Sequence, residues 1–187
     1  MDGSTVFETM GNVELLSQRK LALFASRKAE KIIYDSALEL FLKLCTLPIT
    51  LTGGWQAPLE KYLIKHIPQN VQANFAYYLA KDINQFQPTD FQRRLIEQQK
   101  LLIIAPGLNE KRSSSNAVKK RDELLFAQVS KILFLYVEKN GRLERYFRQL
   151  SGLNYQFYFL DHPLNQSFMG DDVVALNAEN VADLIFS

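Results

Sequence analysis

The stretch Lys20-Leu-Ala-Leu-Phe-Ala-Ser-Arg-Lys28 decides the fold. Leu21 to Ala25 is a continuous apolar run of strand length, which is typical of a strand covered by helices on both faces. Ser26, Arg27 and Lys28 follow directly, and a helical pattern extends over residues 28–44. The first N–H groups of a helix have no partners inside it, and the helix dipole adds partial positive charge there. These three residues therefore form either a phosphate-binding turn, which we predict, or a solvated helix start whose cations bind nothing.

Apolar runs and helical patterns alternate along the rest of the chain. Further strands are expected at residues 49–51, 71–78, 101–105, 132–137 and 156–160, and further helices at 57–66, 90–99, 116–129, 142–150 and 178–186. This alternation predicts an α/β fold with a parallel sheet and right-handed crossovers. Ligands of such sheets bind beyond the carboxyl ends of the strands, where the strand order reverses.

Bulk composition narrows the class of protein. The chain has 187 residues, which fits a single domain, and its net charge of +2 is too small to indicate nucleic-acid binding by itself. Cys45 is the only cysteine, so no intramolecular disulfide forms, and we expect this thiol to be a small buried hydrophobe. His66 and His162 have no partners at the spacing of metal ligands, which disfavours zinc. No apolar run approaches the ~20 residues of a membrane span. We expect a cytoplasmic protein without a metal, a cofactor or a membrane contact.

Two glycines follow the predicted second strand, in Leu51-Thr-Gly-Gly-Trp55. Gly53 and Gly54 either let the backbone approach a ligand, as a second wall of the same pocket, or form a tight turn. The dinucleotide fingerprint G-x-G-x-x-G and the P-loop pattern are both absent from the sequence. We therefore predict neither NAD binding nor ATP hydrolysis.

A basic cluster, Lys119-Lys120-Arg121-Asp122, lies at the front of the helix predicted over 116–129. Cations at a helix N-terminus oppose the dipole, and an anionic ligand would offset that cost. Lys120 and Arg121 are therefore candidate phosphate contacts. The alternative is a solvated helix face on which Asp122 and Glu123 balance the cations.

Two carboxylates, Glu138 and Glu144, flank the turn after the strand predicted at 132–137. They could serve as an acid/base pair, but six residues across a turn fix no geometry. We predict no catalytic residue.

Taken together, these segments resemble the DprA/Smf family, the DNA-processing proteins of bacteria. Ala25-Ser26-Arg27 stands where the family has a Gly-Ser-Arg turn, and Thr52-Gly53-Gly54 stands where it has a Ser-Gly turn. Lys120, Arg121 and Asp122 occupy the Arg-Arg-Asn places of a family helix, and the resemblance covers residues 11–170 approximately. The sequence departs from the family at Ala25 in place of Gly, at Trp55-Gln-Ala-Pro-Leu59 in place of an Ala-Arg-Gly-Ile-Asp stretch, and at Asp122 in place of Asn.

The resemblance implies a Rossmann-like three-layer fold with a mainly parallel central sheet flanked by helices, and residues 1–187 would form one such domain with a short C-terminal unit over 171–187. It further implies a stand-alone domain that binds single-stranded DNA, a recombination-mediator role in DNA uptake with RecA recombinase as a partner, and a homodimer. The contacts for nucleic acid or phosphate that the resemblance implies are Ser26, Arg27, Gly53, Lys120 and Arg121, and the pattern of the residues themselves adds Lys28 and Gly54.

Two alternatives remain open. A related group, the lysine-decarboxylase-like phosphoribohydrolases, carries Pro-Gly-Gly-x-Gly-Thr-x-x-Glu where this chain has Val137-Glu-Lys-Asn-Gly-Arg-Leu-Glu-Arg145. The same pocket could therefore serve a sensor or enzyme for a nucleotide or nucleotide derivative, although most of that motif is missing. The second alternative is a degenerate domain that acts through protein contacts only.

Overall fold

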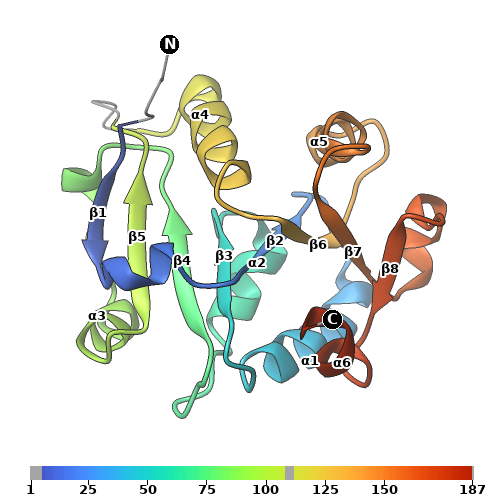
Figure 1. Ribbon diagram of the computed structural model, residues 1–187, viewed down its shortest axis with the longest axis horizontal. Coiled ribbons are helices and arrows are strands. Elements are labelled where there is room, and N and C mark those ends of the chain that lie inside the picture. Colours follow the sequence, from blue (N-terminus) through green and yellow to red (C-terminus); the bar gives the residue numbers. More distant parts are fainter. Residues whose placement is uncertain (1–5, 108–111, 187) are drawn as a thin grey trace.

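One twisted sheet runs through the molecule (Figure 1). The structure is a computed structural model that describes residues 6–107 and 112–186. Within them the sheet has eight strands in the order β1-β5-β4-β3-β2-β6-β7-β8. Strand β1 pairs antiparallel with β5, and all other neighbours are parallel. The strands are β1 (Glu8–Gly11), β2 (Lys20–Ala25), β3 (Thr50–Gly53), β4 (Asn74–Tyr78), β5 (Leu101–Ala105), β6 (Lys131–Tyr136), β7 (Gln156–Leu160) and β8 (Val173–Leu176). The mainly parallel α/β sheet is therefore confirmed.

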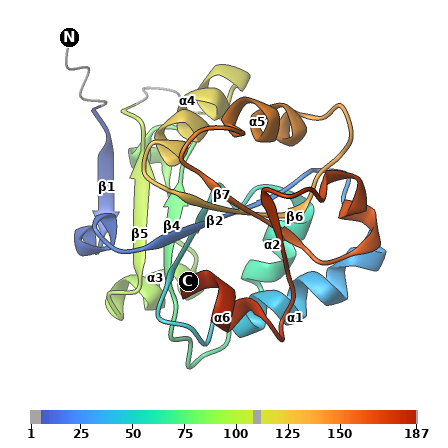
Figure 2. The same cartoon turned by 45° about the vertical axis from the view of Figure 1, so that its right-hand side comes forward.

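Helices cover both faces of this sheet. The α-helices are α1 (Tyr34–Leu44), α2 (Pro58–Ile64), α3 (Asp90–Glu97), α4 (Ser115–Phe126), α5 (Arg142–Leu150) and α6 (Val181–Phe186). Short 3-10 helices lie at Val13–Leu16, Lys31–Ile33, Ile83–Gln85 and Pro163–Phe168. Figure 2 shows α4 and α5 on one side of the sheet and α1, α2, α3 and α6 on the other, which confirms the three layers.

Alternate side chains of β2 pack against the helices on opposite faces of the sheet. Leu21 and Leu23 belong to the buried cluster formed with α1, α2 and α3, whereas Ala22 and Phe24 belong to the cluster formed with α4 and α5. All four are almost completely buried. A strand buried on both faces reads as a continuous apolar run, which is why the sequence marked β2 clearly.

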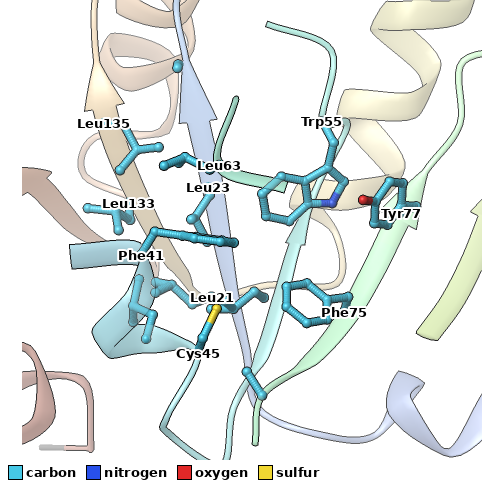
Figure 3. Close-up of a cluster of buried hydrophobic side chains, with 14 of the residues drawn as sticks. Leu21, Leu23, Phe41, Cys45, Trp55, Leu63, Phe75, Tyr77, Leu133 and Leu135 are labelled. Carbon is cyan, nitrogen blue, oxygen red and sulfur yellow. The ribbon is translucent and has the colours of Figure 1, made fainter. Parts of the chain in front are cut away.

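Trp55 and Cys45 lie in the first of these clusters (Figure 3). The Trp55 indole packs edge-on against Phe41 and Phe75, and its Nε1 donates to the Ala76 carbonyl at 3.1 Å. Cys45 is 1% exposed at the end of α1, and burial raises the pKa of its thiol to about 12. The expectation of a buried, structural cysteine is confirmed.

Two helix starts differ from the predictions. The helix expected over 28–44 begins only at Tyr34, because Glu30 has an extended backbone (φ −70°, ψ 145°) and a 3-10 turn follows it. Helix α4 begins at Ser115, where the Ser114 hydroxyl accepts a hydrogen bond from the Ala117 N–H at 3.0 Å. Lys119 is therefore the fifth residue of α4, so the basic cluster begins one turn into the helix, within one residue of its predicted place and beyond the first N–H groups.

The strand order places the reversal point between β2 and β6. The chain builds β2, β3, β4 and β5 outward in one direction and then returns to place β6 on the other side of β2. Connections on opposite faces diverge at such a point and leave a crevice beyond the carboxyl ends of the two strands. We call this place the β2–β6 edge, comprising Ser26, Arg27, Lys28 and Glu138.

Candidate nucleic-acid interface

Ser26 ties the carboxyl ends of β2 and β6 together. Its backbone N–H donates to the Tyr136 carbonyl at 2.9 Å, and its hydroxyl oxygen accepts from the Glu138 N–H at 2.9 Å. The side chain is almost fully buried and engaged. Ser26 is thus a structural link that fixes the β2–β6 edge, and its hydroxyl already holds a protein N–H group.

Arg27 and Lys28 project from that link into solvent. They lie in a turn, so the helix N-terminus that the sequence predicted at these residues is not there. Lys28 pairs with Glu138 at 2.8 Å, and the hydrogen bond and negative charge of Glu138 raise the pKa of Lys28. Arg27 is exposed and forms no ion pair with any residue in the described ranges. The positive charge at this edge therefore comes from side-chain cations rather than from helix N–H groups.

Gly53 and Gly54 follow β3, and a buried guanidinium fills the space above them. Arg121 of α4 is 4% exposed, and a Cβ on Gly54 would lie 2.6 Å from its Cζ. A Cβ on Gly53 would lie 3.0 Å from the Leu23 carbonyl oxygen. Both glycines thus have close protein neighbours, and the neighbour of Gly54 is a cation of this chain.

Arg121 belongs to a charge network inside the molecule. Its Nε donates to Asp122 Oδ1 at 2.8 Å, and Asp122 is completely buried. The other carboxylate oxygen, Oδ2, lies 3.3 Å from Nη1 of Arg142 on α5. Asp122 is therefore compensated from two sides, and Arg121 is committed to it. The predicted phosphate contact at Arg121 is not accessible in this arrangement.

A carboxylate that the sequence reasoning missed, Glu60, occupies the helix N-terminus next to β2. Its Oε1 accepts from the Ala25 N–H at 2.9 Å, and its Oε2 accepts from the N–H groups of Gln56 and Ala57 at 2.7 and 3.0 Å. Burial raises the pKa of Glu60, although these donors and the Arg121 charge oppose the shift. Strand-end and helix N–H groups that could cradle a phosphate thus hold the protein's own carboxylate.

The remaining candidates lie apart from this network. Lys120 is exposed on α4. Glu138 is paired with Lys28, and Glu144 accepts from Arg148 Nε at 2.9 Å, so each carboxylate has its own cation and no acid/base pair forms. In the described part of the chain no three His, Cys, Asp or Glu side chains gather as a metal ion would need.

Solved structures, rather than sequence comparisons, show which proteins share this fold. No protein-family model and no curated protein matches the sequence. Among solved structures, DNA processing protein A (DprA) of Streptococcus pneumoniae superposes with a TM-score of 0.69 at 14% identity, over 95% of this chain and 65% of that protein. DprA of Helicobacter pylori superposes with a TM-score of 0.74 at 12% identity, over 96% of this chain and 86% of that one. The chain has a DprA-like fold.

The H. pylori structure is described as revealing a unique single-stranded DNA binding mode of that protein. In the DprA-like fold of the present chain, the turn that resembles Gly-Ser-Arg ends β2 at the reversal point, next to β6. The chain spans 65% of the pneumococcal protein's length. No helix among the described residues is long and apolar enough to cross a bilayer.

Proposed function

We propose that this DprA-like chain binds single-stranded DNA at the β2–β6 edge. The proposal rests mainly on the position of Arg27. Its guanidinium is exposed at the reversal point of the sheet and forms no ion pair among the described residues. Lys28 stands beside it, and its surface ion pair with Glu138 is weak enough to exchange for a phosphate contact. Lys120 on α4 supplies a further exposed cation.

The internal charge network favours an extended strand over a buried nucleotide. Glu60 occupies the N–H cradle, and Arg121 is neutralised by Asp122 above Gly54. A phosphate that entered this space would displace one carboxylate and meet another. Binding is therefore expected on the outside of the edge, where phosphates of a flexible strand reach solvated cations. In this account Ser26, Gly53, Gly54 and Arg121 shape the edge from beneath and do not contact the phosphates.

The test is a titration of a fluorescent oligo-dT against wild type and the variant Arg27→Ala/Lys28→Ala at two salt concentrations. Both side chains are exposed, so the variant is expected to fold. We expect it to bind more weakly at the lower salt, and wild-type binding to weaken steeply as salt is added. The matched control is Lys43→Ala/Lys65→Ala. It removes two exposed cations near the C-terminal ends of α1 and α2, which lead into the amino ends of β3 and β4, away from the β2–β6 edge.

The control must bind like wild type. Equal binding by wild type and the Arg27/Lys28 variant would refute the assignment to this edge. An absence of binding by wild type would refute the proposed function. Arg121→Ala is unsuitable for this test, because removing a buried guanidinium would leave Asp122 under-compensated and destabilise the fold.

A second candidate ligand is a nucleotide derivative, and a specific cavity favours it. The cavity has a volume of about 480 Å³ beside the turn after β6, with Lys139, Glu144, Arg148, Phe147 and Phe168 in its wall. Cations next to aromatic rings suit a phosphorylated base. A nucleotide panel in a thermal-shift assay tests this, because a ligand that binds only the folded state raises the melting temperature. An unchanged melting temperature with every nucleotide of the panel would refute nucleotide binding in this cavity.

Three finer points follow from the resemblance and stand as proposals. The chain would act as a recombination mediator in contact with RecA recombinase, would form a homodimer, and would fold as one domain over residues 1–187. Co-elution with RecA on oligo-dT tests the first, sedimentation equilibrium the second, and a single cooperative unfolding transition the third.

A further inference from the structure

A groove lined by cationic side chains and one aromatic ring lies between α4 and α5. Its wall includes Ser115, Lys119, Arg142, Arg145, Tyr146 and Gln149, and its volume is about 240 Å³. We call it the α4–α5 groove. Figure 2 shows the two helices on the same face of the sheet. Three of these side chains are cationic, and no carboxylate lines the groove. Its net charge is therefore positive.

Sequence spacing explains why these residues share one wall. Arg142, Arg145, Tyr146 and Gln149 stand at positions i, i+3, i+4 and i+7 of α5, which is a single helix face. Ser115 and Lys119 stand one turn apart at the start of α4. The partial positive charge of the first turn of α4 therefore adds to the cations that face it.

Arg142 is held in place for a contact in this groove. Its guanidinium lies 5.8 Å from the centre of the Tyr146 ring and 3.3 Å from Asp122 Oδ2, yet the side chain is 43% exposed. Arg145 is exposed and has no ion-pair partner in the described ranges. Lys119 makes only a solvated pair with Glu123 at 3.7 Å, which competes weakly.

We propose that the α4–α5 groove holds a second segment of the same single-stranded nucleic acid. Arg145 and Lys119 contact phosphates, and the Tyr146 ring, backed by Arg142, offers a stacking surface for a base. Arg142 and Asp122 link the groove to Arg121, which lies over Gly54 just after β3, the strand beside β2. This inference rests on the proposed function and extends its footprint from the edge of the sheet onto its helical face.

The test compares Lys119→Ala/Arg145→Ala with wild type and with the control Lys43→Ala/Lys65→Ala in oligo-dT titrations. Two lost phosphate contacts lower the slope of log affinity against log salt by about 1.4, which corresponds to a roughly 10- to 30-fold loss of affinity at ~0.1 M salt. Tyr146→Leu tests stacking, and we expect a roughly fivefold or greater loss. Tyr146→Phe keeps the ring and should bind like wild type.

The outcomes separate this inference from the proposed function. If the Arg27/Lys28 variant weakens binding while the Lys119/Arg145 variant binds like the control, the groove is refuted and the edge stands. If wild type binds no oligo-dT, both fall. Should Tyr146→Phe lose as much as Tyr146→Leu, the ring is not a stacking surface. Circular dichroism of each variant verifies that a loss of binding is not a loss of fold.

Discussion

Replacing Gly54 with alanine tests whether a buried guanidinium, rather than a ligand, requires glycine after β3. The new Cβ would lie 2.6 Å from Arg121 Cζ, well inside van der Waals contact. Arg121 cannot move aside freely, because its Nε and Nη2 are both bonded to buried Asp122. Overpacking a buried site costs about 1–3 kcal/mol, and breaking a buried ion pair costs about 3–5 kcal/mol. We expect Gly54→Ala to lower the free energy of unfolding by about 2–4 kcal/mol.

Urea and thermal denaturation measure this loss, which should lower the melting temperature by roughly 5–15 °C for a chain of this size. The matched control is Gly170→Ala, since nothing lies within 4 Å of a Cβ built there, and it should stay within about 0.5 kcal/mol of wild type. In an Arg121→Lys background, which removes the planar guanidinium, the penalty of Gly54→Ala should shrink. An unchanged stability of Gly54→Ala, or an equal penalty in both backgrounds, would refute the packing of Arg121 on this glycine.

Three further predictions concern stability. Asp122→Ala leaves Arg121 buried without its carboxylate and should lower the free energy of unfolding by about 3–5 kcal/mol in urea denaturation, whereas a loss below 1 kcal/mol would contradict the buried network. Gln99 follows the end of α3 with φ 59°, so Gln99→Gly should relieve left-handed strain and raise stability by up to about 1 kcal/mol, and a clear decrease would count against that geometry. Cys45 should resist alkylation until the protein unfolds. Burial raises the pKa of its thiol to about 12 in the folded state, against 9.0 in the unfolded chain, so the unfolded state loses the proton first as pH rises. The free energy of unfolding should therefore fall between pH 9 and 12 more in wild type than in Cys45→Ala. Rapid labelling of the native protein would overturn that prediction.

The central strands and the layers were predictable because burial on both faces leaves a simple mark in the sequence. Strands β5 and β7 have the predicted bounds. The edge strands β1 and β8 were not predicted, since Glu8–Gly11 is largely exposed and Val173–Leu176 is only partly buried. A short strand at the edge of a sheet has one neighbour and no need for a continuous apolar run.

The candidate site was predictable only in part, because its geometry depends on contacts across long sequence distances. The sequence located Ser26, Arg27 and Lys28 at the end of β2, but not the extended backbone at Glu30 that delays the helix. Nothing in the basic cluster reveals that Arg121 packs on Gly54.

Glu60 did carry a local signal that the sequence reasoning passed over. Pro58 and Glu60 stand at the first and third positions of α2, where proline and a capping carboxylate are both favoured. That the same carboxylate also reaches the Ala25 N–H at the end of β2 is a tertiary contact, which no local pattern contains.

Whether single-stranded DNA binds at the β2–β6 edge is tested most directly by the salt dependence of oligo-dT binding by wild type and by Arg27→Ala/Lys28→Ala. We expect a linear decrease of log affinity with log salt for wild type, and a slope smaller by about 1.4 for the variant, because two phosphate contacts are lost. The Lys43→Ala/Lys65→Ala control should keep the wild-type slope. Identical slopes and affinities for wild type and the Arg27/Lys28 variant would contradict the claim that single-stranded DNA binds at the β2–β6 edge.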